Sequence, residues 1–146
     1  VAFHLIHVTF PLIKDPKLLL GITQNILNSY EAAIETILKY ERSLNLIPPY
    51  NNNFQGKMNV FIHKVASKHN LSQEYLDLIL ELKELIDAQK KSPIDFSRKE
   101  KFVICTGDYD LKSITLRELK GHLQKNKEFL SFMDKIISEN LTEKNK

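Results

Sequence analysis

Apolar residues recur at every third or fourth position along most of this chain, which is the pattern of amphipathic helices. The longest such stripe follows Asp15, a good helix N-cap, and Pro16, which suits the first helical position. At about 1.5 Å per residue this helix would be roughly 45 Å long and would need packing partners along one whole face. Its expected buried positions are Leu19, Ile22, Ile26, Tyr30, Ala33, Ile37, Tyr40 and Leu44.

Two further helices are expected in the middle of the chain, after the segment "NLIPPYNNN", whose prolines and asparagines favour turns. The first begins near Phe54. The second follows Ser72, a candidate N-cap, with Leu71 and Leu76 placed as a hydrophobic staple across it. Their apolar stripes are Phe54, Met58, Phe61, Ile62 and Val65, and then Tyr75, Leu78, Ile79, Leu82, Leu85 and Ile86.

The last helix has the clearest start, because Thr115 and Glu118 are spaced as a capping box and Ile114 and Leu119 as a staple. After Glu139 the sequence becomes a polar tail that we expect to fray. The stripe expected to be buried is Leu116, Leu119, Leu123, Leu130, Met133 and Ile137.

The helical pattern breaks in "KFVICTGDYDLKSIT", which is typical of a β-hairpin. Residues 102–105 form a short β-branched-rich run, Gly107 and Asp108 are a turn signal, and residues 111–115 can return as the second strand. Just before it, Ser97 and Glu100 also have capping-box spacing, so a helical turn could precede the first strand.

The first thirteen residues are ambiguous, since some apolar positions fit a helical stripe and others alternate like a strand. We favour a helix, because the rest of the chain is helical. The sequence therefore predicts an all-α protein: an up-and-down bundle of four to five helices with a small β-hairpin inserted before the last helix. Residues 1–140 would form one domain, and residues 141–146 a frayed polar tail.

Composition supports an ordinary globular protein, with 42% hydrophobic and 27% charged residues in 146. No apolar run is long enough to cross a bilayer, and the apolar start lacks the basic region of a signal peptide, so no membrane partner is expected. The chain does not begin with Met, so part of the first element could be absent. A single cysteine, Cys105, excludes an internal disulfide and favours a reducing compartment, most simply the cytoplasm.

Metal and cofactor chemistry find little support in the sequence. His4 and His7 are spaced for one helix face, but no acid or cysteine lies within a turn of them. There is no Gly-rich phosphate loop or dinucleotide fingerprint, and Asp108 and Asp110 occupy a turn where acids are common. We expect no metal and no cofactor.

Basic residues gather before and within the last helix. The net charge is only +3, but the stretch from Lys90 to Lys127 holds ten Lys/Arg against five Asp/Glu. Arg117 falls at the second helical position, where free backbone N–H groups can bind an anion together with Lys120. The other candidate phosphate contacts are Arg98, Lys99 and Lys101.

Arg117 and His122 are the candidate catalytic pair. At roughly 100° per residue their side chains point some 140° apart on a regular helix, so they converge only if the helix start is distorted. Gly121 could permit such a distortion, or it could let another helix or a second subunit approach closely.

An Arg followed by His a few residues later, at the start of the last major helix of a small all-α domain, resembles the HEPN superfamily. That resemblance implies a dimer in which Arg117 and His122 of both subunits line a shared cleft and cleave RNA without a metal. It makes His122 the general acid or base and gives Arg117 the role of neutralising the phosphate.

Three functions follow, in order of preference. The first is a non-enzymatic binding or assembly module, with a protein partner or a second copy docking on the long second helix and the apolar first segment. The alternative is a HEPN-like RNA-binding protein or metal-independent endoribonuclease. A helical lipid or small-molecule binder, supported only by abundant Phe and Leu, comes last.

Overall fold

The computed structural model describes residues 17–91, 95–98, 101–105 and 111–144. The expected first helix, with His4 and His7, and the capping pair Asp15 and Pro16 lie outside these ranges. Within them the chain is mainly helical, which confirms the predicted helical class. None of the described helices is long and apolar enough to cross a membrane.

Helix α3, Lys17–Ser43, is the centre of the structure. Its 27 residues make a rod of about 40 Å, which packs against α4, α5, α6 and two of the strands. The predicted stripe is largely correct, but the buried surface is much wider than one stripe and takes in Leu27, Ile34, Leu38 and Glu41. Other parts of the same chain cover these residues.

Helix α4, Phe54–Val60, starts at Asn53, whose side-chain oxygen accepts a hydrogen bond of 2.7 Å from the Gly56 N–H. It continues as a π-helical segment, η2, Phe61–Ala66. The expected middle helix is therefore one continuous element with a wider final part.

Helix α5, Gln73–Lys91, begins after Ser72, whose hydroxyl oxygen accepts a 3.3 Å hydrogen bond from the Glu74 N–H. Leu76 is buried and Leu71 packs on the core, in keeping with the predicted staple. Its buried face carries Leu78, Ile79, Leu82, Leu85 and Ile86, all of them members of the predicted stripe.

A three-stranded antiparallel sheet in the order β1-β2-β3 precedes the last helix. The strands are β1, Asp95–Arg98, β2, Lys101–Cys105, and β3, Leu111–Thr115. The sequence analysis expected only two strands here. The helical turn suggested from Ser97 is wrong, because Ser97 lies in β1 opposite Phe102. Pairing with β2 outweighs the local capping preference of that residue.

Helix α6, Leu116–Lys144, has 29 residues and runs beyond residue 140, where the domain was expected to end. Its first half follows the prediction, with Leu119 and Leu123 buried. Further along, Phe129 and Ile136 are buried, while the predicted Leu130 and Ile137 are only half-buried. At these two positions the buried residue is one earlier than predicted, while Met133 is buried as predicted.

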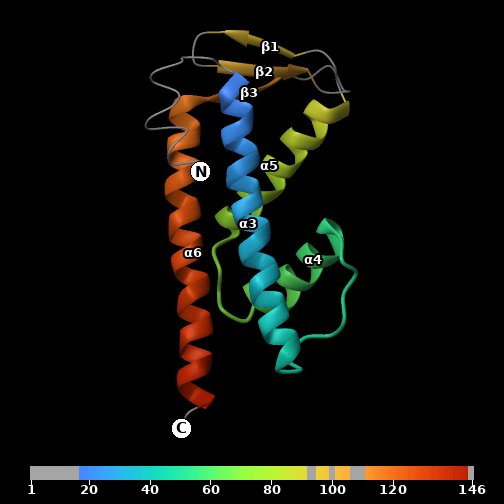
Figure 1. Ribbon diagram of the computed structural model, residues 1–146, viewed down its shortest axis with the longest axis vertical. Coiled ribbons are helices and arrows are strands. Elements are labelled where there is room, and N and C mark those ends of the chain that lie inside the picture. Colours follow the sequence, from blue (N-terminus) through green and yellow to red (C-terminus); the bar gives the residue numbers. More distant parts are fainter. Residues whose placement is uncertain (1–16, 92–94, 99–100, 106–110, 145–146) are drawn as a thin grey trace.

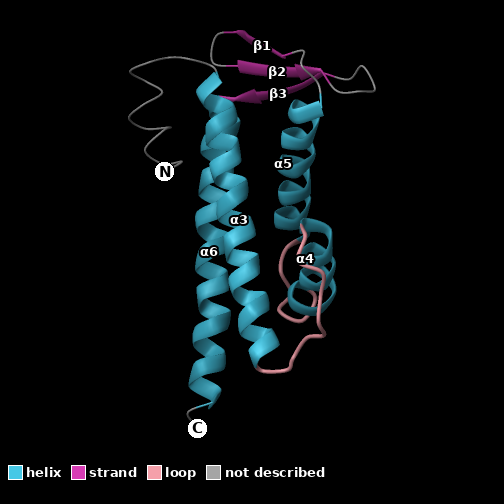
Figure 2. Ribbon diagram, turned by 45° about the vertical axis from the view of Figure 1, so that its right-hand side comes forward, coloured by secondary structure: helices cyan, strands magenta, loops and turns pink. Residues whose placement is uncertain are grey.

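Figures 1 and 2 show α3 and α6 running side by side in the same direction, with α5 running the opposite way. Helix α4 lies beyond the start of α5, and the sheet covers the end of the bundle where α6 begins. With η2 counted as the end of α4, the described ranges hold four helices. The up-and-down order holds for α3, α5 and α6, while α4 is a short addition on the side of α3.

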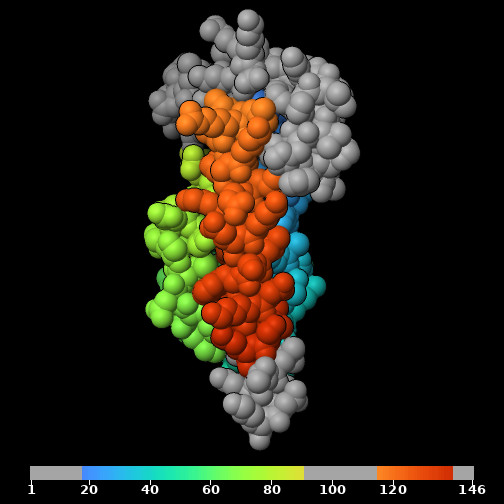
Figure 3. Space-filling model, turned by 90° about the vertical axis from the view of Figure 1, so that its left-hand side faces the viewer, coloured from blue at the N-terminus to red at the C-terminus, as the bar shows by residue number. Residues whose placement is uncertain are grey.

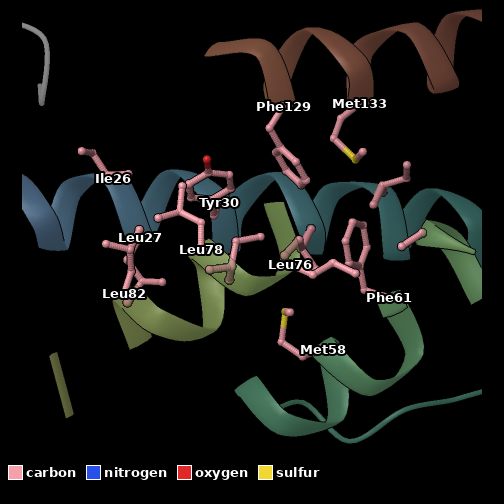
Figure 4. Close-up of a cluster of buried hydrophobic side chains, with 14 of the residues drawn as sticks. Ile26, Leu27, Tyr30, Met58, Phe61, Leu76, Leu78, Leu82, Phe129 and Met133 are labelled. Carbon is pink, nitrogen blue, oxygen red and sulfur yellow. The ribbon is translucent and has the colours of Figure 1, made fainter. Parts of the chain in front are cut away.

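Aromatic rings hold the helices together near the middle of the core (Figure 4). The Phe129 ring of α6 meets the Tyr30 ring of α3 edge-on, with centroids 5.0 Å apart. The rings of Phe61 and Tyr75 approach Phe129 at 6.0 and 5.9 Å. One side chain of α6 thus contacts all three of the other helical elements, so it should contribute strongly to stability.

Candidate functional site

The start of α6 is fixed by Thr115, the last residue of β3. The Glu118 N–H donates a 3.2 Å hydrogen bond to Oγ1 of Thr115, which is one half of the predicted capping box. Arg117 is therefore the second helical residue, as predicted, and its side chain is exposed. Lys120, one turn further on, is exposed as well.

His122 lies in a crevice between α6, α5 and α3. Its neighbours there are Thr23 of α3, Glu81, Leu82 and Leu85 of α5, and Glu118 and Leu119 of its own helix. The free volume of about 20 Å³ is close to the space that one water needs.

Burial lowers the pKa of His122, because the charged imidazolium loses hydration in the crevice. The nearby carboxylates of Glu81 and Glu118 act in the opposite direction, and Lys125 adds to the lowering. Desolvation is the largest of these effects. The neutral imidazole is therefore favoured at neutral pH, which suits a proton acceptor but not a proton donor.

The structure does not bring Arg117 and His122 together. Arg117 does not line the His122 crevice, and α6 is continuous through Gly121, so the two side chains keep the angle of about 140° expected for a regular helix. A Cβ at Gly121 would meet nothing within 4 Å. Gly121 thus neither bends α6 nor admits another described segment of this chain.

The predicted anion-binding residues are partly assembled by the sheet. Arg98 of β1 is the backbone partner of Lys101 of β2, and Lys101 is in turn the partner of Thr115. These three residues therefore form a row across the sheet that ends at Thr115, directly before α6. Arg117 and Lys120 lie in the first turns of that helix. Lys99 lies outside the described residues.

Sequence reasoning missed a buried contact between a carboxyl group and an imidazole at the far end of α3. The Glu41 carboxylate is fully buried, and its Oε1 lies 3.6 Å from Nε2 of His69, which follows η2. The charge of Glu41 excluded it from the apolar stripe, although it stands four residues after the buried Ile37. This four-residue spacing was the feature of the sequence that could have predicted the burial of Glu41.

A second missed feature is a pocket of about 190 Å³ between α3, α4 and α5. It is lined by two lysines, one glutamate and three apolar residues from segments well separated in sequence: Glu31, Ile34, Phe54, Lys57, Met58 and Lys83. No local motif marks it, because it exists only once the three helices have packed.

A metal site is not apparent in the portion of the chain that the structure describes, where no group of three His, Cys, Asp or Glu side chains is placed to hold an ion. Neither the family models nor the searches of curated proteins and of solved structures gave a significant match to this chain.

Proposed function

We propose that this protein is a non-enzymatic helical binding module that recognises another protein. The observation that carries the proposal is the divergence of the candidate catalytic pair: Arg117 is exposed on one side of α6, and His122 is inserted toward α5 on another. The preformed pocket between α3, α4 and α5 supports a binding function instead of a catalytic one.

A different protein is a better-supported partner than a second copy of this chain. The argument for self-association came from the long second helix and from the apolar first segment. The buried residues of α3 are covered by α4, α5, α6 and the sheet of the same chain, which removes the first of these supports. The first segment lies outside the described residues and adds no structural support.

Affinity capture with the tagged full-length chain tests the proposal. An extract of the source cells should yield a partner at stoichiometric level, and Arg117→Ala and His122→Ala should capture as much of it as the unmodified chain. The expectation follows because neither side chain belongs to the pocket between α3, α4 and α5. Absence of any partner would overturn the binding-module proposal, whereas its loss in both variants would place the contact at Arg117 and His122.

The second candidate is an RNA-binding protein of HEPN-like type. It is favoured by the row of backbone positions from Arg98 through Lys101 to Thr115, together with the exposed Arg117 and Lys120. In this account the basic residues contact phosphates, and by the HEPN resemblance a dimer would be needed for cleavage.

Salt-dependent retention on immobilised single-stranded RNA tests this candidate, because each phosphate contact releases counterions on binding. Reversing the charge of Lys99 and Lys101, or of Arg117 and Lys120, should lower the salt concentration of elution. The matched control reverses Lys64 and Lys68, which are exposed on or beside η2. Equal elution of all variants would rule out this contact surface.

A further inference from the structure

The pocket between α3, α4 and α5 has an apolar floor and a charged rim. Ile34 and Met58 are each 2% exposed and form the floor, and the half-buried Phe54 forms one wall. Figure 4 shows Met58 pointing from α4 toward the side chains of the other helices. The rim carries the ammonium groups of Lys57 and Lys83 and the carboxylate of Glu31.

The two lysines are held at the rim by weak contacts. Lys83 Nζ lies 5.0 Å from the centre of the Phe54 ring and 3.4 Å from the Asp87 carboxylate. Lys57 Nζ lies 3.6 Å from Glu35, which also pairs with Lys39 at 3.2 Å. Partly exposed ion pairs of this kind contribute at most about 1 kcal/mol, so an incoming carboxylate can compete for both ammonium groups.

The size of the pocket restricts what can enter it. Sites for whole small molecules usually measure roughly 300–1,000 Å³, whereas this pocket measures about 190 Å³. Protein interfaces, in contrast, are often anchored by one bulky side chain inserted into a small desolvated pocket. The volume therefore favours a single side chain of a larger partner.

We propose that this pocket binds an acidic peptide segment of a partner protein, which inserts one bulky apolar side chain over Met58 and places its carboxylates on Lys57 and Lys83. The proposal rests on the binding-module function and specifies its partner. Glu31 sets the direction of the segment, because its carboxylate repels acidic groups and accepts hydrogen bonds from peptide N–H groups.

The test uses the ¹⁵N-labelled full chain and a synthetic peptide, GSEELEESG, as the probe. Its addition should shift the backbone amide signals of Ile34, Phe54 and Met58. Two control peptides, one with serine in place of the leucine and one with lysines in place of the glutamates, should leave these signals unchanged. The serine peptide removes the anchor, and the lysine peptide removes the charge complementarity.

Matched variants then assign the contact to the rim. The double variant Lys57→Gln with Lys83→Gln should bind the probe about fivefold more weakly, as expected for the loss of exposed charge pairs. Lys64→Gln with Lys68→Gln removes the same total charge from exposed positions that do not line the pocket, and should bind normally. Unchanged affinity in the pocket variant would overturn the assignment.

Two further results would overturn this inference and leave the binding module intact. The first is a captured cellular partner whose binding is unaffected by the Lys57 and Lys83 substitutions. The second is N-acetyl-leucine binding as tightly as the peptide, which would make the pocket a small-molecule site. Failure to capture any partner would instead count against the proposed function itself.

Discussion

The surroundings of His122 decide its protonation more than its position in the sequence does. Its imidazole shares a crevice with Leu82, Leu85 and Leu119, and the loss of hydration there outweighs the attraction of Glu81 and Glu118 for the charged form. A residue that sequence spacing made a catalytic candidate is therefore, in the folded chain, a half-buried group packed between helices.

A pH dependence of stability follows from this lowered pKa. In the unfolded chain His122 takes up a proton near its ordinary pKa of 6.5, but in the folded chain it does so only at lower pH. The stability contributed by the neutral form is thus complete above the unfolded pKa and is lost as the pH falls through the folded pKa. Urea unfolding of the protein and of His122→Gln between pH 7.5 and pH 5 checks this.

The expected outcome is a free energy of unfolding that declines more steeply toward acid pH in the unmodified protein than in His122→Gln. Parallel curves would show that the imidazole is equally hydrated in both states. A steeper decline in the variant would reverse the sign of the effect and contradict the burial of His122.

The contact between Glu41 and His69 is energetically costly to bury, because the carboxyl group of Glu41 is fully buried beside a partly exposed imidazole. Replacing His69 with Ala should lower the free energy of unfolding by about 3 kcal/mol, since it leaves the buried carboxyl group of Glu41 without its neighbour. His63→Ala, at an exposed position of η2, is the control and should change stability by less than about 0.5 kcal/mol.

Combining His69→Ala with Glu41→Leu separates charge from packing. If the cost of His69→Ala arises from the unpaired carboxylate, this double variant should recover most of the lost stability. Equal losses in the single and the double variant would mean that the imidazole acts by filling space.

At the scale of elements, two helix starts followed from short local motifs, whereas part of the buried face of α6 did not. The N-caps Ser72 and Thr115 act as expected because capping is local chemistry between residues two or three positions apart. On α6 the prediction chose Leu130 instead of its apolar neighbour Phe129, although it placed Met133 correctly. Phe129 is the residue that faces the core, because its ring packs near aromatic rings of α3, η2 and α5. These rings lie far away in sequence.

Substitutions at these two neighbours test the observed face of α6. Phe129→Ala should lower the free energy of unfolding by about 3–5 kcal/mol, because it removes a fully buried ring and leaves a cavity. Leu130→Ala, at a half-buried position, should cost clearly less. Chemical denaturation of both variants provides the comparison, and a larger loss for Leu130→Ala would restore the face predicted from sequence.

The sheet illustrates another limit of sequence reasoning. Strands β2 and β3 lie in an apolar, β-branched region with turn residues between them, which is a local signal. Strand β1, with the sequence DFSR, has no such pattern and exists because β2 offers it a pairing edge. A local capping motif was therefore mistaken for the start of a helical turn.

At the scale of the whole molecule, the site candidates separate into two regions. The pocket between α3, α4 and α5 could not be predicted from any single stretch of sequence. The positions of Arg117 and Lys120 could be predicted from the capping motif at the start of α6. Figure 3 shows α6 exposed along one side of the molecule, between the green atoms of α5 and the blue atoms of α3. The exposed Arg117 and the crevice of His122 belong to different sides of this helix.

The most direct test of a binding rather than a catalytic role is incubation of the purified full chain with fluorescently labelled single-stranded RNA in EDTA. A non-enzymatic binding module predicts no cleavage above the buffer blank, and no difference between the unmodified protein and His122→Ala. Metal-independent cleavage that disappears in His122→Ala would contradict the account and make the α6 pair catalytic.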